Sequence, residues 1–127
     1  MKYLLAILLA SCAVPDRINH GITGPHGDAP SMAAMCLYST GARLPEAPFQ
    51  GVTVEFSDQI DTAYNYRDSI VAPTGSSERV LAHEFVHVAL TRYAPHVANH
   101  HQWMEQHGTC FGGCVSMPTG HYSRGCE

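Results

Sequence analysis

The sequence has few cations and no long apolar run. Besides Lys2, its basic residues are six scattered arginines, and the 127-residue chain has a formal net charge of −4. Proteins that bind nucleic acid need a basic surface to neutralise phosphates. A helix that crosses a bilayer needs about 20 apolar residues in succession, and no segment here reaches 18. The sequence therefore argues against nucleic-acid binding and predicts no transmembrane helix.

Charged residues are also scarce, at 14% of the chain, whereas hydrophobic residues make up 45%. Intrinsically disordered chains have the opposite balance, with low hydrophobicity and high net charge. A chain of 127 residues is long enough for one domain and too short for two of ordinary size. We therefore expect a single globular domain.

The first residues are typical of a bacterial export signal. An eight-residue apolar run follows Lys2 and is too short to span about 30 Å of hydrocarbon. Residues 9–12 (LASC) resemble a lipobox, in which the cysteine is acylated and becomes the first residue of the mature protein. We predict a signal peptide over residues 1–11, lipidation of Cys12 and anchoring of the exported protein to the cell envelope. Plain secretion after cleavage at Ala13 is the alternative.

Export would place the remaining cysteines in an oxidising compartment, where an even number of cysteines favours disulfides. These cysteines are Cys36, Cys110, Cys114 and Cys126. A small loop closed by Cys110 and Cys114 would leave Cys36 to pair with Cys126, and the two other pairings remain open. A zinc site made of four cysteines is the alternative, although their spacing is not the paired C-x₂-C of zinc ribbons.

Glycine, proline and hydrophobic periodicity divide the mature chain. These features predict a flexible tether over residues 12–31 and a folded domain over residues 32–127. Period-two alternation predicts a strand over 51–56, and a second strand or hairpin arm follows over 64–72. The predicted helices, each with a capping residue at its first position, are 31–38 with Ser31, 77–93 with Ser77 and 99–107 with Asn99. We expect an irregular, disulfide-held tail over 109–127.

Between its polar ends, the predicted helix 77–93 is apolar from residue 80 to residue 90 except for the polar side chains in the run His83-Glu84-Phe85-Val86-His87. Residues at i and i+4 share one helix face, so both imidazoles can reach one metal ion at about 2.0–2.1 Å. A glutamate beside the first histidine can take a proton from a metal-bound water. This H-E-x-x-H pattern predicts Zn²⁺ bound by His83 and His87, with Glu84 as the catalytic general base.

A catalytic zinc ion needs a third protein ligand, and the histidine-rich segment 99–107 offers candidates. His100 is the first choice, because it shares a helix face with Trp103 and Met104, which we expect to be buried. His101 is the alternative, because a ligand near a helix start need not follow helical angles. The remaining candidates follow in the order Glu105, His96 and His107.

The run from residue 70 to residue 104, about a third of the chain, resembles the core of small zincin metallopeptidases. It is most similar to the SprT/Spartan-like plan, in which H-E-x-x-H is followed a dozen or so residues later by a histidine, an aromatic residue and a methionine. Asn99-His100-His101 stands here where those proteins usually have Gly-His-Gly. The resemblance implies an α+β fold with a short sheet packed on the active-site helix and a second short helix closing the site.

The same resemblance implies a zinc metallopeptidase that hydrolyses peptide bonds of a peptide or protein substrate. An extended substrate would add alongside the strand 52–56. Weaker candidates for stabilising the oxyanion of the tetrahedral intermediate are Tyr93, Tyr122 and Arg124. Two alternatives remain open, namely a non-catalytic metal-binding surface lipoprotein and an envelope-assembly module that uses the domain to bind partners.

Overall fold

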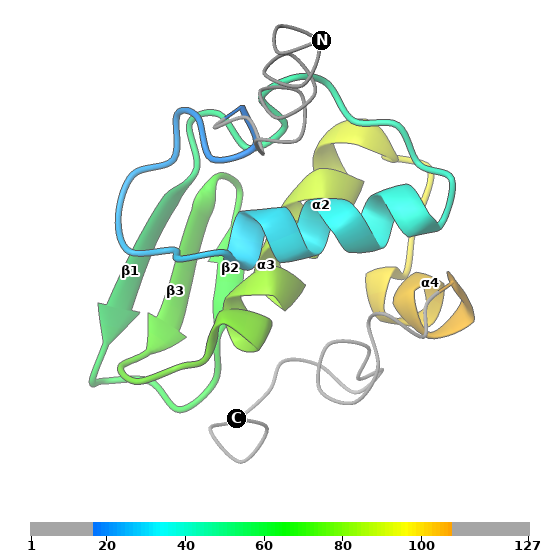
Figure 1. Cartoon of the computed structure of the whole chain (residues 1–127). Coiled ribbons are helices and arrows are strands. Elements are labelled where there is room, and N and C mark those ends of the chain that lie inside the picture. Colours follow the sequence, from blue (N-terminus) through cyan, green and yellow to red (C-terminus); the bar gives the residue numbers. More distant parts are fainter. Residues whose placement is uncertain (1–16, 108–127) are drawn as a thin grey trace, which may run out of the picture.

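The structure, a computed structural model, describes residues 17–107 (Figure 1). The predicted signal peptide, the lipidation site Cys12, the cysteines 110, 114 and 126, and the weaker candidates Tyr122 and Arg124 lie outside the described residues. Within them the element order is α2 (Ala29–Ser39), β1 (Thr53–Ser57), β2 (Tyr64–Tyr66), β3 (Ser69–Pro73), α3 (Glu78–Tyr93) and α4 (His100–His107). The predicted α+β class is confirmed.

The three strands form one small mixed sheet in the order β1-β3-β2. β1 runs parallel to β3, with Val54 paired to Ile70, and β2 runs antiparallel to β3, with Tyr66 paired to Ser69. The segment 64–72, predicted as one strand or a hairpin arm, is thus a hairpin whose two strands join at Arg67-Asp68. Arg67 has a φ of 54°, the left-handed conformation that tight hairpin turns require.

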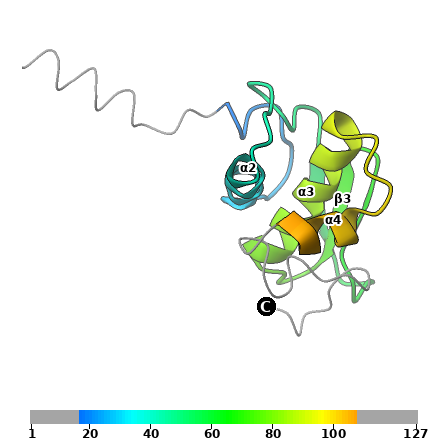
Figure 2. The same ribbon diagram turned by 90° about the vertical axis from the view of Figure 1, so that its right-hand side faces the viewer.

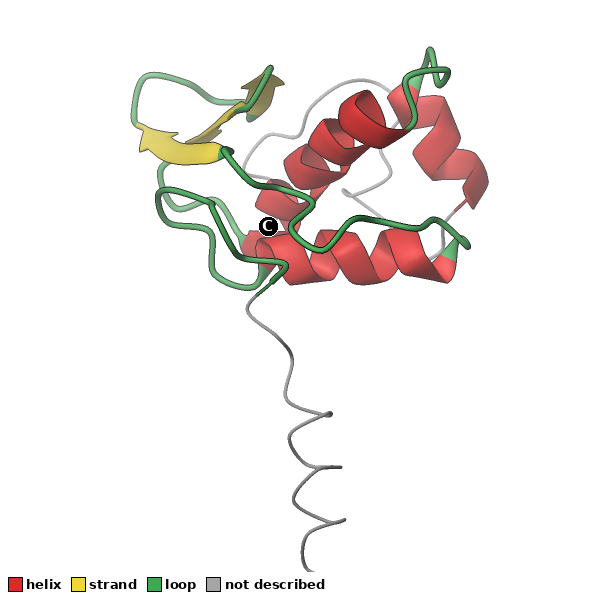
Figure 3. Cartoon of the chain, turned by 90° about the horizontal axis from the view of Figure 1, so that it is seen from above, coloured by secondary structure: helices red, strands yellow, loops and turns green. Residues whose placement is uncertain are grey.

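α3 is the central element, because it contacts α2 and also β2 and β3. Figure 3 shows the helices gathered on one side of the strands. Every residue of α3 from 80 to 90 is buried, as its apolar sequence predicts. Phe85 packs edge-to-face on Phe49 with 4.9 Å between ring centroids, and both side chains are fully buried. No helix within 17–107 combines the length and apolar character that a bilayer span requires.

The helix caps follow the predictions at two of three positions. Ser77 caps α3 by accepting a hydrogen bond from the Val80 amide, and the side-chain oxygen of Asn99 accepts one from the amide of Gln102. Ser31 is not a cap, because α2 already begins at Ala29. Pro30 stands in the first turn of α2, where a helix needs no backbone N–H donor and tolerates proline.

The chain between residues 17 and 28, which the sequence assigned to the tether, lies against β1. The amide of Thr23 donates to the carbonyl of Val52, and the carbonyl of Thr23 accepts from the amide of Val54. Because this segment pairs with β1 and the following Ala29 is fully buried, the folded part begins before residue 32. The strand predicted to receive an extended substrate is therefore already paired along both of its edges around Val54.

Candidate metal centre

α3 presents two imidazoles at one point, and α4 adds a third. His83 is fully buried and His87 is 7% exposed, and their Nε2 atoms lie 2.9 Å apart. The Nε2 atom of His101, which is half-buried, lies 3.2 Å from that of His83 and 3.0 Å from that of His87. The three atoms form a nearly equilateral triangle, so the three side chains are close enough to bind one metal ion.

The secondary structure explains why these nitrogens meet. His83 and His87 are one turn apart on α3, so their side chains share a face. Figure 2 shows α4 lying across α3. α4 is fixed in place by Met104, which is fully buried and lies one turn after His101. The buried side of α4 therefore delivers His101 to the face of α3 that carries the H-E-x-x-H pair.

Hydrogen bonding between the rings does not account for this triangle. Each Nε2 of a neutral imidazole is either a donor or an acceptor. Among three mutually close Nε2 atoms, at least two have the same role and repel each other. A shared cation instead attracts all three lone pairs. The point equidistant from the three atoms is about 1.8 Å from each, which is close to the usual 2.0–2.1 Å zinc–nitrogen distance, so the three residues would fit a zinc ion.

His100, the predicted third ligand, is not in this group of three. Its Nδ1 lies 2.9 Å from Nδ1 of His87, on the side of the His87 ring that faces away from the other two Nε2 atoms. His101, which the sequence placed second, is the third member of the group. Among the lower-ranked candidates, Glu105 and His96 are exposed. His107, also exposed, donates to the Trp103 carbonyl and stacks on the Trp103 ring.

Glu84 follows His83 directly and is fully buried. On α3 it stands one residue after His83 and three residues before His87, so the three residues occupy neighbouring positions on the helix. Burial raises the pKa of Glu84 from 4.5 to about 8, because the charged carboxylate is poorly solvated inside the protein. A carboxyl group with this pKa is mostly protonated at pH 7 in the metal-free protein.

Burial acts on the neighbouring imidazoles in the complementary direction. It lowers the pKa of His101, and it lowers the pKa of His100, with a smaller contribution from the nearby His101 charge. Both shifts favour the neutral ring. Neutral imidazole is the form that binds metal ions, so the lowered pKa of His101 favours the form that a metal site requires.

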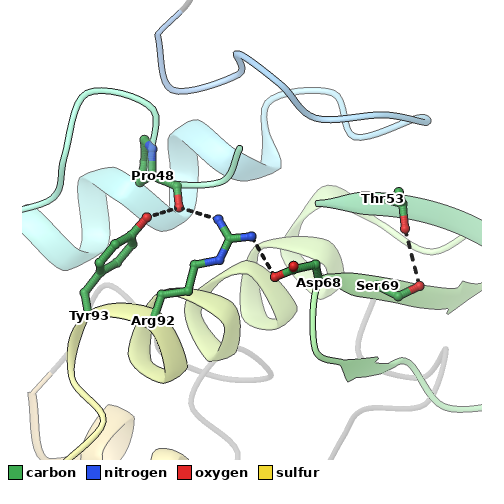
Figure 4. A network of polar contacts seen from close by, with 6 residues as sticks. All are labelled: Pro48, Thr53, Asp68, Ser69, Arg92 and Tyr93. Carbon is green, nitrogen blue, oxygen red and sulfur yellow. Dashed lines mark hydrogen bonds and ion pairs between the residues drawn. The ribbon is translucent and has the colours of Figure 1, made fainter. Parts of the chain in front are cut away.

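A separate polar network anchors the carboxyl-terminal turn of α3 (Figure 4). The Arg92 guanidinium donates to the carbonyl of Pro48 at 3.0 Å and to Asp68 Oδ1 at 2.7 Å. The Tyr93 hydroxyl donates to the same Pro48 carbonyl. Arg92 thereby ties α3 to the loop before β1 and to the β2–β3 turn. Tyr93, a weaker oxyanion candidate, belongs to this network.

Comparison of the chain with protein-family models, curated proteins and solved structures found no match. The function is therefore inferred from the side chains of the cluster and from their surroundings. The sequence identified the pair on α3 and the segment that supplies the third imidazole. It did not indicate the contact between His87 and His100. The available signal for this contact was the pair of consecutive histidines, His100 and His101, at the start of a predicted helix.

Proposed function

We propose that the protein is a zinc-dependent metallopeptidase in which His83, His87 and His101 bind Zn²⁺ and Glu84 is the general base. One observation carries this proposal, namely the three Nε2 atoms 2.9–3.2 Å apart, with the fully buried Glu84 next to His83 in the chain. Zinc suits the donor set, because catalytic zinc sites use three protein ligands and keep one position for water. Imidazole nitrogen is among the ligands that zinc prefers.

The mechanism assigns each side chain one task. The three imidazoles hold the ion, which when bound acidifies water and polarises the carbonyl of the peptide bond. Glu84 accepts a proton from the water whose oxygen attacks the carbonyl carbon. It then gives this proton to the amide nitrogen as the carbon–nitrogen bond breaks. With a cation held by the three imidazoles, the pKa of Glu84 would fall against the effect of burial, and its carboxylate would be available as a base.

The sheet suggests where an extended substrate would lie. Within the described residues, β2 pairs with β3 along one edge and no other strand of the sheet covers its second edge. β2 also contacts α3, the helix that carries the histidine pair. β1 is engaged by Thr23. We therefore assign backbone pairing with an extended peptide to β2 rather than to β1.

The non-catalytic alternative shares the metal centre and differs only at Glu84, so a Glu84→Gln variant separates the two. We expect purified wild-type protein to contain zinc and to cleave casein or a peptide library. The variant is expected to retain zinc and to lose about 10²- to 10⁴-fold of the cleavage rate, the usual contribution of a general base. Zinc without cleavage in the wild type would favour the non-catalytic protein. Equal cleavage by both would contradict the role of Glu84.

We also propose that the exported protein is anchored to the cell envelope through lipidated Cys12. The proposal rests on residues 9–12 and the short apolar run before them. Mass spectrometry of the mature protein is expected to show a chain that begins at an acylated Cys12. A mature chain that begins after Ala13, or an unmodified Cys12, would show secretion without an anchor.

A further inference from the structure

We propose that His100 is a positioning residue that holds His87 in the tautomer able to bind a metal through Nε2. This inference rests on the metal centre proposed above and adds to it a residue outside the set of ligands. The Nδ1 atoms of the two rings are 2.9 Å apart, and the ring centroids are 5.1 Å apart. His87 thus has one ring nitrogen in the Nε2 cluster and the other against His100.

The hydrogen positions follow from the metal-binding role of His87. A contact of 2.9 Å between two ring nitrogens is a hydrogen bond only if exactly one of them carries the hydrogen. Nε2 of His87 must be bare to bind a metal, so the hydrogen of this neutral ring is on Nδ1. Nδ1 of His87 therefore donates to Nδ1 of His100, and His100 carries its own hydrogen on Nε2.

Metal-bound histidines commonly donate their second ring N–H to a carboxylate or a carbonyl, which fixes both tautomer and ring orientation. Here the acceptor is instead the imidazole of His100, which is not one of the proposed ligands. The first turn of α4 supplies both functions from adjacent positions, because His101 reaches the Nε2 cluster while His100 reaches the far side of His87. The Asn99 cap and the buried Met104 hold this turn in place.

Two substitutions in the full chain test the inference. His100→Leu removes the acceptor, whereas His100→Asn places an amide oxygen near the position of Nδ1. We expect the zinc dissociation constant, measured by competition with a chromophoric chelator, to rise about 10- to 100-fold for the leucine variant. The asparagine variant is expected to regain most of this affinity. His96→Leu, at an exposed position, is the matched control and is expected to bind like the wild type.

The outcomes separate this inference from the metal centre itself. Wild-type affinity in His100→Leu would overturn the inference while leaving the metal centre intact. Equal losses in both His100 variants, combined with wild-type affinity in His101→Ala, would make His100 a ligand and also overturn it. A wild-type chain that binds no zinc would contradict the proposed function instead. Far-ultraviolet circular dichroism of the metal-free variants verifies that each one is folded.

The tautomers of His87 and His100 provide a second test, because they would not depend on His100 if that residue only stabilised the fold. Long-range ¹H–¹⁵N correlation spectra of the zinc-loaded chain distinguish protonated from bare ring nitrogens. We expect the hydrogen of His87 on Nδ1, and that of His100 on Nε2 with a bare Nδ1. A hydrogen on Nδ1 of His100 would reverse the direction of the bond and overturn the inference.

Discussion

Replacing Glu84 by glutamine is expected to stabilise the metal-free protein at neutral and alkaline pH. Glu84 is fully buried, and burial raises its pKa from 4.5 to about 8. The unfolded chain therefore loses this proton near pH 4.5, whereas the folded protein keeps it until about pH 8. Between these values the folded state binds more protons, so the free energy of unfolding falls as the pH rises. Glutamine does not ionise and avoids this loss.

The structure gives the size of the effect. Each unit of pKa difference corresponds to about 1.4 kcal/mol, so a pKa raised from 4.5 to about 8 lowers the stability of the wild type by about 5 kcal/mol once the pH exceeds 8. At pH 7 the expected penalty is about 3 kcal/mol. Below about pH 4.5 the carboxyl group is protonated in both states, and wild type and variant are expected to be equally stable. The buried carboxyl group of Glu84 thus destabilises the metal-free folded protein above about pH 4.5.

Urea unfolding in the presence of a chelator, at several values from acidic to alkaline pH, measures this difference. The gap between wild type and Glu84→Gln is expected to widen as the pH rises. Glu105→Gln is the matched control, because Glu105 is exposed and water solvates its charge in both states. A gap that stays constant across the pH range would refute the conclusion that Glu84 is an acid with a raised pKa.

Two further results are expected. First, the metal-free protein is expected to lose stability as the pH falls below about 6.5. Burial lowers the pKa of His100 and His101, so the unfolded chain takes up protons at a pH where the folded protein does not. A thermal unfolding midpoint that stays constant from pH 7 to pH 5 would contradict this. Gly24→Ala is expected to destabilise by more than about 1 kcal/mol, because its new Cβ would lie 2.0 Å from the Val54 carbonyl oxygen at a φ of +97°. Gly51 also has a positive φ, but a Cβ added there would meet no atom within 4 Å, so Gly51→Ala is the control for backbone strain alone. If chemical denaturation shows the same loss of stability for both variants, the contact with Val54 contributes nothing.

The parts of the fold set by local signals were predictable from the sequence. α3 has a capping serine, a wide apolar stripe and a proline after its end, and these features act within a few residues of the chain. The histidine pair on α3 was predictable for the same reason, because the i, i+4 spacing alone places His83 and His87 on one face.

The parts set by tertiary packing were not predictable. The β2–β3 turn contains Arg67 at positive φ, where no glycine or asparagine marks the reversal. The segment around Thr23 is rich in glycine and proline and reads as a tether, yet pairing with Val52 and Val54 places it in the fold. The choice between His100 and His101 depends on how α4 lies across α3, which helical periodicity does not specify.

X-ray absorption spectroscopy at the zinc edge of the zinc-loaded full chain tests the metal centre most directly. We predict three imidazole nitrogens and one oxygen at about 2.0–2.1 Å, with one imidazole lost in His101→Ala. A sulfur shell near 2.3 Å would place the zinc on the cysteines instead. An unchanged number of imidazoles in His101→Ala would contradict the assignment of the third ligand, and a chain that retains no zinc would contradict the metal centre as a whole.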